Sequence, residues 1–515
     1  MKRVLCFLLL LSMLAFAACG GESTADSSTA DRSETQSVAD SSAAAPETAI
    51  APDISGMTAE QAEQALKDAG FEVRVRKKNY DDVPVGEVAG MDLTAGKEYD
   101  YGDVCYLYIS SGKTLGAQAL EYKQGALVAN REVLDVGANS DYTPLNYEYM
   151  KAAWLSQYDM NDVYVDGAFQ RAEDDFTQRI ETLFGGLAEL GLNTLFVQLR
   201  PNGDSMYPSA YYCPSSYAVG SYGADFTYDP LKIMVDVAHK HNLSIHGWIN
   251  PLRCMDVNAI DLINISYGLR DFEQNHMDDY VVKYDGKFYL NPGREEVRQL
   301  IINGAAEIAR YYDIDGIHID DYFYPTTESS FDKASFLDQT EYLSVADFRK
   351  ASLNALVGGI YSAVKAENPK LIFGVSPAGQ PGAVRKAYAD IDTWLSTEGY
   401  LDYIMPQLYW GFELRGSEFD KLYRNWNSLI KIDIKLIPGL SLSRAASGET
   451  SEWVNNKDVL KRCVEYANGF GGKGFSLFSS DSILSAFDGS RVPNTLEEMD
   501  NLLDYVNQIE DTPIE

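Results

Sequence analysis

From about residue 148 onward, short apolar runs alternate with longer segments in which apolar residues recur every three to four positions. The short runs have the length of strands and lie at 151–158, 194–201, 244–251, 316–323, 372–379, 403–410, 435–442 and 474–480. The segments with helical spacing lie at about 171–190, 230–242, 295–312, 343–367, 384–396, 417–430 and 456–468. A regular alternation of strands and helices is typical of parallel α/β folds. Eight such units predict a (β/α)8 TIM barrel with insertions over residues 148–485.

Three segments interrupt or flank this alternation. The longest insertion, 252–314, contains the alternating stretch 281–290 around Asp285-Gly286, a dipeptide that favours a tight turn, and therefore predicts a β-hairpin. Residues 114–147 are expected to be a connector. Residues 486–515 are expected to form a C-terminal helix and an acidic tail.

Residues 51–113 carry a different pattern. Thr58 precedes a segment from Ala59 to Ala69 with helical spacing of small and apolar residues, and Gly70 is placed to end that helix. Strand-like runs follow at 71–75, 83–88 and 104–109, with turn residues between them. We predict a small α+β domain with one helix packed on a three-stranded sheet.

This stretch resembles a PASTA domain, the module found on penicillin-binding proteins and serine/threonine kinases of Gram-positive bacteria. The resemblance implies an association with the cell wall, in which the module either binds wall material or acts as a spacer. The motifs that carry it are Pro52-Asp53-Ile54-Ser55-Gly56-Met57-Thr58, Ala69-Gly70-Phe71, Pro84-Val85-Gly86, Ala95-Gly96 and Ser110-Ser111-Gly112-Lys113.

The first residues have the pattern of an export signal. A basic start precedes the apolar run 4–16, which is too short for a permanent membrane span, and Ala17-Ala18-Cys19-Gly20 follows. A Cys directly after small residues is similar to the bacterial lipobox, so we expect residues 1–18 to be a lipoprotein signal peptide and Cys19 to carry a lipid. A plain signal peptide is the alternative. Residues 19–50 are rich in Ser, Ala, Thr, Asp and Glu, and predict a disordered tether.

Composition excludes several classes of protein. The 515 residues are 45% hydrophobic and 23% charged, which is the balance of a globular chain and excludes wholesale disorder. The 43 basic and 76 acidic side chains give a net charge of −33, which repels phosphate backbones, so we expect no nucleic-acid partner.

Cysteine and histidine usage gives no support for a metal centre. Apart from Cys6 in the signal and Cys19, four cysteines remain, and none forms a CxxC pair. The chain has five His and no HExxH motif, and it lacks both a phosphate-binding Gly loop and the GxSxG turn of serine hydrolases. We therefore expect no metal and no cofactor. Cys213 and Cys254 follow neighbouring predicted strands and are the pair to test for a disulfide.

Polar and aromatic side chains cluster where the predicted strands end. In a parallel barrel these ends meet at the carboxyl-terminal mouth, where active sites lie. Aromatic faces stack on sugar rings, and amides and carboxylates bind hydroxyl groups, so this mouth predicts carboxylate chemistry on a polyol or glycan. The candidates are Arg200, Asn202 and Asp204 after the second strand, His246, Trp248, Asn250 and Arg253 at the third, His318, Asp320, Asp321 and Tyr322 at the fourth, and Gln407, Tyr409 and Trp410 at the sixth.

Among the carboxylates, Asp320 and Asp321 stand at the end of the fourth predicted strand. Strand alternation directs His318 and Asp320 to one side, which we take as the barrel interior, and Asp321 to the other. Glycoside hydrolysis normally requires two carboxyl groups. We expect Asp320 to be one of them, with Asp321 as its partner if the strand ends there. Asp204 in the loop after the second strand is the main alternative partner, and Glu413 and Asp159 are weaker candidates. His318 could contact substrate or could only orient Asp320, and Arg200 could equally be a structural ion-pair partner.

Several motifs in this region look like glycosyl-hydrolase-like family 10. The resemblance implies a barrel glycosidase of bacterial envelopes, and a characterised branch of that family acts on peptidoglycan glycan strands stripped of their stem peptides. The motifs are Gln198-Leu-Arg-Pro-Asn-Gly-Asp204-Ser-Met-Tyr-Pro-Ser, His246-Gly-Trp-Ile-Asn-Pro-Leu-Arg253, Tyr289-Leu-Asn-Pro-Gly-Arg-Glu-Glu-Val-Arg298, Asp315-Gly-Ile-His-Ile-Asp-Asp-Tyr-Phe-Tyr-Pro325, Phe373-Gly-Val-Ser-Pro377 and Asp402-Tyr-Ile-Met-Pro-Gln-Leu-Tyr-Trp410.

Together these features predict an extracytoplasmic glycoside hydrolase, anchored to the membrane of a Gram-positive-type envelope through its N-terminal lipid. Its expected substrate is a polysaccharide, either a peptidoglycan glycan or a related envelope glycan. Two alternatives stay open. The chain could be a glycan-binding lipoprotein without catalytic activity, or a cell-wall scaffold positioned by its PASTA-like module.

Overall fold

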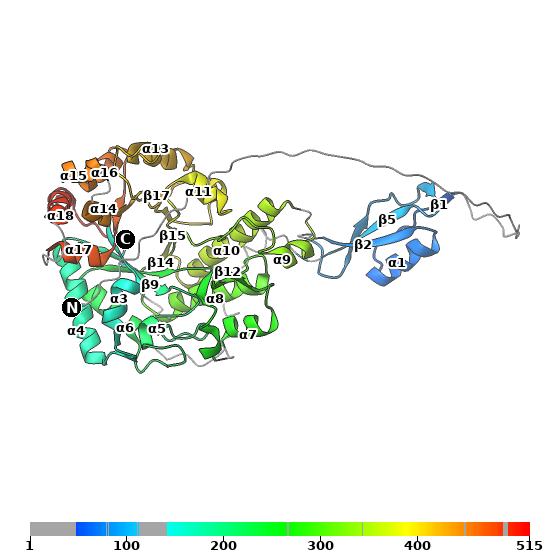
Figure 1. Cartoon of the computed structure of the whole chain (residues 1–515). Coiled ribbons are helices and arrows are strands. Elements are labelled where there is room, and N and C mark those ends of the chain that lie inside the picture. Colours follow the sequence, from blue (N-terminus) through cyan, green and yellow to red (C-terminus); the bar gives the residue numbers. More distant parts are fainter. Residues whose placement is uncertain are drawn as a thin grey trace, which may run out of the picture.

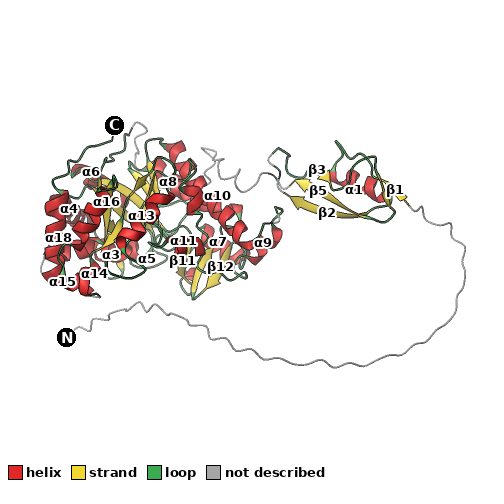
Figure 2. Ribbon diagram, turned by 90° about the horizontal axis from the view of Figure 1, so that it is seen from above, coloured by secondary structure: helices red, strands yellow, loops and turns green. Residues whose placement is uncertain are grey.

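The computed structural model describes residues 48–112 and 142–514, apart from 79, 81, 111, 265–266, 342, 448–449 and 488–492 (Figures 1 and 2). The predicted signal peptide, Cys19 and most of the predicted tether and connector lie outside the described residues. None of the helices in the described ranges is long and apolar enough to cross a membrane.

The N-terminal module contains one helix, α1 (Ala59–Asp68), as predicted. Its first turn is closed by a capping box, in which Thr58 accepts from the Gln61 backbone N–H and the Gln61 side chain accepts from the Thr58 N–H. The helix ends at the C-cap Ala69, and Gly70 follows with φ 101°, a conformation that favours glycine.

The helix packs on a three-stranded sheet in the order β2–β5–β3, made of β2 (Glu72–Lys78), β5 (Val104–Ser110) and β3 (Val88–Met91). The strand expected at 83–88 instead begins at Val88, because Pro84 and Gly86 form a turn closed by the Glu87 N–H on the Pro84 carbonyl. Two further short strands, β1 (Thr48–Ile50) and β4 (Glu98–Asp100), pair with each other.

The larger part of the chain is built on a nine-stranded sheet in which every pair of neighbours is parallel. Its order is β17–β16–β15–β14–β10–β9–β6–β19–β18. The strands are β6 (Met150–Leu155), β9 (Thr194–Arg200), β10 (Ser244–Ile249), β14 (Gly316–Ile319), β15 (Ile372–Val375), β16 (Tyr403–Ile404), β17 (Lys435–Leu436), β18 (Gly439–Ser441) and β19 (Gly474–Phe478).

The two end strands of this sheet are consecutive in the chain. Only Ile437 and Pro438 separate β17 from β18, and Pro438 has no N–H to donate to a ladder. An isolated parallel bridge joins Gln407, beyond the end of β16, to Gly439 in β18. The sheet is therefore curled, and the seventh predicted strand is split in two.

The predicted strand starts agree closely with the structure, whereas the strands end earlier than predicted. For example, β14 stops at Ile319 and β16 at Ile404, although the apolar runs continue to 323 and 410. The residues after these ends leave the ladder and form loops at the carboxyl edge of the sheet. This early ending frees Asp321 from regular strand alternation, whereas Asp320 still faces Asn250 in the strand register.

Helices surround the strands of the sheet (Figure 2). The helix expected at 384–396 is replaced by two short helices, separated by Tyr388 with φ 60°. The helices are α3 (Gln157–Tyr164), α4 (Glu173–Glu189), α5 (Ser216–Val219), α6 (Pro230–Lys240), α7 (Gly268–Asn275), α8 (Glu295–Tyr311), α9 (Lys333–Asp338), α10 (Val345–Glu367), α11 (Pro381–Lys386), α12 (Ile391–Trp394), α13 (Phe419–Leu429), α14 (Ser443–Ser447), α15 (Ser451–Asn455), α16 (Val459–Asn468), α17 (Ser480–Phe487) and α18 (Pro493–Val506), with a 3-10 turn η1 (Ile260–Leu262).

The insertion after β10 contains the predicted hairpin. Strands β12 (Val281–Tyr284) and β13 (Lys287–Leu290) pair antiparallel across Asp285 and Gly286, both of which have positive φ. A third strand, β11 (Arg253–Asp256), pairs with β13 and begins at one of the candidate site residues. Strands β7 (Val165–Asp166) and β8 (Phe169–Gln170) form a separate small hairpin.

Candidate functional site

Asp320 is the buried carboxylate at the carboxyl edge of the sheet. It follows β14 directly and is 3% exposed. The Asn250 side-chain amide donates to both of its oxygens, at 2.9 Å and 2.7 Å, and the Tyr322 backbone N–H lies 3.4 Å from Oδ1. Burial, followed by the negative charge of Asp321, raises the pKa of Asp320 to about 8. Asp320 therefore retains a proton at a pH at which an ordinary aspartic acid is ionised.

A chain of amides fixes the orientation of Asn250. The Gln157 backbone N–H donates to Gln198 Oε1 at 2.8 Å, so the Gln198 amide nitrogen must point the other way. Gln198 Nε2 donates to Asn250 Oδ1 at 2.7 Å, which leaves Asn250 Nδ2 facing Asp320. Because Gln198 and Asn250 are both buried, each amide has one consistent orientation. The β6, β9, β10 and β14 strand ends are thereby joined into one hydrogen-bonded unit.

Asp321 lies beside this unit and is half-buried. Burial raises its pKa, although a hydrogen bond from the Gln407 side chain and the nearby Arg253 guanidinium both favour the ionised form. Arg253 lies 3.9 Å from the centre of the Tyr322 ring and donates through Nε and Nη2 to the Pro201 carbonyl. It also lowers the pKa of Asp320.

Aromatic side chains adjoin the two carboxyl groups. Tyr322 is 41% exposed, and Tyr409 is half-buried with its ring 6.1 Å from the ring of Phe478. Burial raises the pKa of Tyr409, and the charges of the two aspartates add to that effect. Trp410 is half-buried against Gly379, where an added Cβ would lie 2.8 Å from its ring. The structure thus brings Gln407 and Tyr409 close to the fourth-strand carboxylates.

Arg200 lies elsewhere, in the layer between the sheet and α8. The register between β10 and β9 shifts between Trp248 and Ile249, so that Ile249 pairs with Arg200. Because of this irregularity, the Arg200 side chain points toward α8 and not to the face that simple alternation predicts. Its guanidinium sits 4.1 Å over the Tyr212 ring, and Nη1 approaches the Ile301 carbonyl at 3.5 Å. This position favours the structural role of Arg200 over a contact with substrate.

Asp204 is occupied within the loop that follows β9. It is fully buried, its Oδ1 accepts from the Asn202 backbone N–H at 2.8 Å, and its Oδ2 accepts from the Tyr222 hydroxyl at 2.9 Å. Burial raises its pKa. Both Asp204 oxygens and the Asn202 backbone therefore organise the loop, and Asp204 is not joined to Asp320 by any hydrogen bond within the described residues.

His318 and His246 are fully buried in the sheet interior. Trp154 donates to His318 Nε2 at 3.2 Å, so the Nδ1 proton of His318 is directed at the Tyr403 hydroxyl, 2.9 Å away. Burial keeps the pKa of His318 well below its ordinary value and lowers that of His246 to about 3. Both imidazoles are neutral packing and hydrogen-bonding groups, and this placement does not favour the substrate contacts expected of them.

Trp248 lies in the same interior layer as these histidines. Its ring packs in an apolar cluster with Trp154, Phe196 and Tyr403, and it is 6% exposed. Its indole N–H has no hydrogen-bond partner within the described residues.

The disulfide considered for Cys213 and Cys254 is absent. Both residues are free and buried, and burial raises the pKa of both thiols. Gly203 lies against Cys254, where an added Cβ would come within 2.8 Å of the sulfur. The two loops are instead held by packing and by the hydrogen bonds around Asp204.

Residue Gln198 is the part of the site whose role the sequence did not reveal. It stands in the second predicted strand among other polar residues, and only the strand register shows that it links Gln157 to Asn250. A sequence feature that could have revealed this role is the alternation of side chains in β9, β10 and β14. In each of these strands every second residue lies on one face, and this places polar side chains together near the strand ends.

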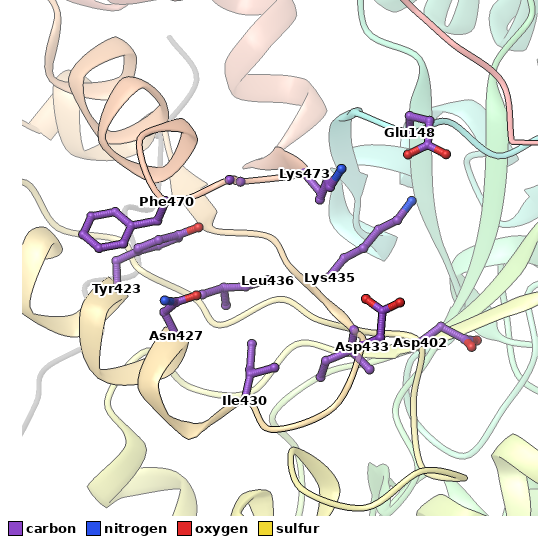
Figure 3. Close-up of a pocket in the computed structure, with 13 residues that line it drawn as sticks. Glu148, Asp402, Tyr423, Asn427, Ile430, Asp433, Lys435, Leu436, Phe470 and Lys473 are labelled. Carbon is purple, nitrogen blue, oxygen red and sulfur yellow. The ribbon is translucent and has the colours of Figure 1, made fainter.

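A separate cavity of about 520 Å³ lies at the opposite, amino-terminal edge of the sheet (Figure 3). Residues that precede or begin β6, β16, β17 and β19 line it, together with Tyr423 and Phe470. Its lysines, Lys435 and Lys473, lie among acidic side chains and are remote from Asp320 because all strands of the sheet are parallel. In the described part of the chain, no group of three His, Cys, Asp or Glu is placed to hold a metal ion.

Comparisons with known proteins identify the families to which the two parts of the chain are similar. The model of the family described as glycosyl hydrolase-like 10 matches residues 149–455, and that of the PASTA domain matches residues 50–111. The chain is 35% identical over 273 residues to glycosyl hydrolase YngK of Bacillus subtilis, which covers 48% of this chain and 52% of that protein. It is 32% identical over 317 residues to glycosyl hydrolase DigH of Escherichia coli, covering 55% of this chain and 70% of DigH. The chain therefore spans about half the length of YngK and more of DigH.

Solved structures with low similarity include two glycoside hydrolases. The PgaB glycoside hydrolase domain of Bordetella bronchiseptica is 11% identical with a TM-score of 0.44, covering 69% of this chain and 99% of that one. An α-L-fucosidase of Paenibacillus thiaminolyticus is 14% identical with a TM-score of 0.43, covering 70% and 49%. Likenesses at this level carry no argument about function. The glycosyl hydrolase-like 10 model matches more than half of the residues and therefore shows the family. The chain belongs to the glycosyl hydrolase-like 10 family and carries a PASTA domain.

Proposed function

We propose that this protein is a glycoside hydrolase whose catalytic carboxyl groups are Asp320 and Asp321. The observation that carries the proposal is the buried Asp320, held by Asn250 and kept protonated by burial and by the neighbouring charge of Asp321. A carboxylic acid with a raised pKa beside a second carboxyl group is the arrangement that glycosidases use to protonate a leaving group.

In the proposed reaction, Asp320 donates its proton to the glycosidic oxygen as the bond to the anomeric carbon breaks. Asp321, oriented by Gln407 and with its ionised form favoured by Arg253, stabilises the positive charge that develops on the sugar ring or activates the attacking group. A water molecule supplies the oxygen that ends on the anomeric carbon, and its proton returns the pair to its starting state. Tyr322, Tyr409 and Trp410 supply the aromatic surface for the sugar, and the indole N–H of Trp248, unpartnered within the described residues, donates to one of its hydroxyl groups.

The proposed scaffold is a closed (β/α)8 barrel. The consecutive end strands β17 and β18 and the bridge between Gln407 and Gly439 support closure. In such a barrel, Asp320, Asp321, Arg253, Tyr409 and the Asn250 amide would all lie at the carboxyl-terminal mouth, where catalysis takes place.

We further propose that the substrate is a cell-wall glycan, in the first instance peptidoglycan strands without stem peptides. The PASTA domain supports an extracytoplasmic, wall-associated location. Export as a lipoprotein anchored through Cys19, with residues 19–50 as a tether, fits that location and remains part of the proposal. The membrane would then hold the barrel within reach of the wall.

The proposal is tested by incubating the chain with glycan strands, with and without stem peptides, and measuring the products by mass spectrometry. We expect shorter fragments with the wild type and none with Asp320→Asn, which preserves the shape of the side chain but cannot donate the proton. Asp390→Asn is the matched control, because Asp390 likewise accepts from an asparagine amide but lies outside the site. Retention of the glycan without cleavage by the wild type would favour the alternative of a non-catalytic glycan-binding lipoprotein.

A further inference from the structure

A pair of tyrosines stands on the β6 side of the carboxyl edge, and the proposed chemistry does not use it. Tyr158 is 71% exposed, the second most exposed large hydrophobic side chain of the described sheet domain after Phe169. Its ring meets that of Tyr217 edge to face, with the ring centres 5.7 Å apart and the planes at 89°. An aromatic side chain left this exposed presents an apolar face that water wets poorly, and a sugar ring is a suitable cover for such a face.

The sheet order places this pair and the other aromatic group of the site at different positions around the carboxyl edge. Tyr158 is the second residue of α3, just after β6, and Tyr217 lies in α5 within the loop after β9. Around the closed barrel proposed above, β14 lies three strands from β6 and two strands from β16, so Tyr158, Asp320 and Tyr409 take separate positions around the mouth. Helices α3 and α5 lie side by side in both views of the molecule (Figures 1 and 2).

The surroundings hold the pair in place. Ser156 caps α3 in a reciprocal capping box, and Ser215 caps α5 through the Tyr217 backbone N–H. The loop that carries Tyr217 is fixed by the buried Asp204, which accepts from the Tyr222 hydroxyl. Through these contacts Asp204 positions the loop. The two rings are already ordered before a ligand binds, so binding to them loses little conformational entropy.

The pair is also connected to the catalytic unit. The residue before Tyr158 is Gln157, whose backbone N–H begins the amide chain through Gln198 and Asn250 to Asp320. The side chain of Gln157 is buried, and its Oε1 has no hydrogen-bond partner within the described residues. An acceptor of this kind beside an exposed ring is a second sign that the place is suited to a polar ligand with hydroxyl groups.

We infer that Tyr158 and Tyr217 form a distal sugar-binding subsite, so that a glycan chain crosses the carboxyl edge from Tyr409 and Trp410, over Asp320, to Tyr158. This inference rests on the proposed function. A chain bound on both sides of the cleavage point is cut at internal bonds, and long chains gain binding that short ones cannot reach. The enzyme therefore prefers long strands and produces fragments of intermediate length before it produces disaccharides.

The test compares kcat/KM for peptide-free glycan strands of two lengths, about four sugars and about twelve sugars. The short strands are chosen to occupy only the sites next to Asp320, and the long strands to reach the distal subsite as well. We expect Tyr158→Ala to lower kcat/KM about ten-fold for the long strands, the effect of one aromatic contact, and to leave the short strands nearly unchanged. Tyr158→Phe, which keeps the ring, should retain the preference. Phe470→Ala is the control, because Phe470 is a half-exposed aromatic residue of the opposite edge (Figure 3).

Binding to the Asp320→Asn chain separates the subsite from catalysis. Calorimetry should show weaker binding of long strands when Tyr158→Ala is added to Asp320→Asn, and no such loss with Phe470→Ala. Equal effects of Tyr158→Ala on long and short strands, or none, would overturn the subsite while leaving the proposed hydrolysis intact. Absence of cleavage by the wild type with strand binding that still depends on Tyr158 would overturn the proposed function and leave the subsite standing.

Discussion

Removal of the Asn250 amide tests whether the hydrogen bonds to Asp320 set the pH range of the reaction. Asn250 is 1% exposed and donates to both oxygens of the carboxyl group, at 2.9 Å and 2.7 Å. These bonds favour the ionised form of Asp320 and so lower its pKa, against the larger effects of burial and of Asp321. In Asn250→Ala that contribution is lost, and the pKa of Asp320 rises further.

The size of the pKa change follows from the strength of the hydrogen bonds between Asn250 and Asp320. A hydrogen bond to a charged group contributes about 1.5–3 kcal/mol. One pKa unit corresponds to about 1.4 kcal/mol, so loss of one such interaction raises the pKa of Asp320 by about 1–2 units. If protonated Asp320 is the acid, the alkaline limb of the kcat/KM profile moves to higher pH by the same amount. The maximal rate falls as well, because Asp320 loses the group that orients it.

The assay is the pH dependence of kcat/KM on one glycan substrate for the wild type, Asn250→Ala and a matched control. Asn354→Ala is suitable as the control, since Asn354 also donates to a carboxylate, that of Asp390 at 2.9 Å, and accepts from another side chain. Its profile should coincide with that of the wild type. An alkaline limb that stays in place in Asn250→Ala, or that moves to lower pH, would refute the assignment of Asp320 as the proton donor.

Two further substitutions follow from the same structure. Arg253→Gln removes a positive charge that lowers the pKa of both aspartates, so both limbs of the kcat/KM profile should move to higher pH, and a shift of either limb to lower pH would contradict this. Arg349→Met breaks an ion pair with Asp332 in which both side chains are fully buried, and should lower the free energy of unfolding by about 3–5 kcal/mol in denaturant titrations. A loss below about 1 kcal/mol, as for surface pairs, would show that Asp332 finds other partners.

Much of the fold could be predicted because its signals are local. Apolar runs and helical spacing locate the strand starts and most helices, and Asp285-Gly286 locates a hairpin turn, since each depends on a few neighbouring residues. Strand ends were predicted too late, because apolar residues at the mouth continue after the ladder stops, as they do beyond Ile404. The seventh strand divides at Ile437 and Pro438 because its partner changes there from β16 to β19, which an apolar count does not detect.

The site was harder to predict, because side-chain direction depends on register. Alternation correctly places Asn250 beside Asp320, one strand apart. It fails for Arg200, since the shift opposite Ile249 turns that side chain toward α8. Alternation also does not tell how deep along a strand a side chain lies. His318 is an example, because it lies below the mouth among aromatic rings and not at the surface. The sequence supplies residue types, whereas their depth and direction require the assembled sheet.

The most direct measurement of the central claim is hydrolysis of peptide-free glycan strands in water enriched in oxygen-18. We expect new fragments whose reducing end carries one heavy oxygen, because water attacks the anomeric carbon after Asp320 protonates the leaving oxygen. The same incubation with Asp320→Asn should yield no fragments. Fragments without the label, or equal cleavage by Asp320→Asn, would contradict the account.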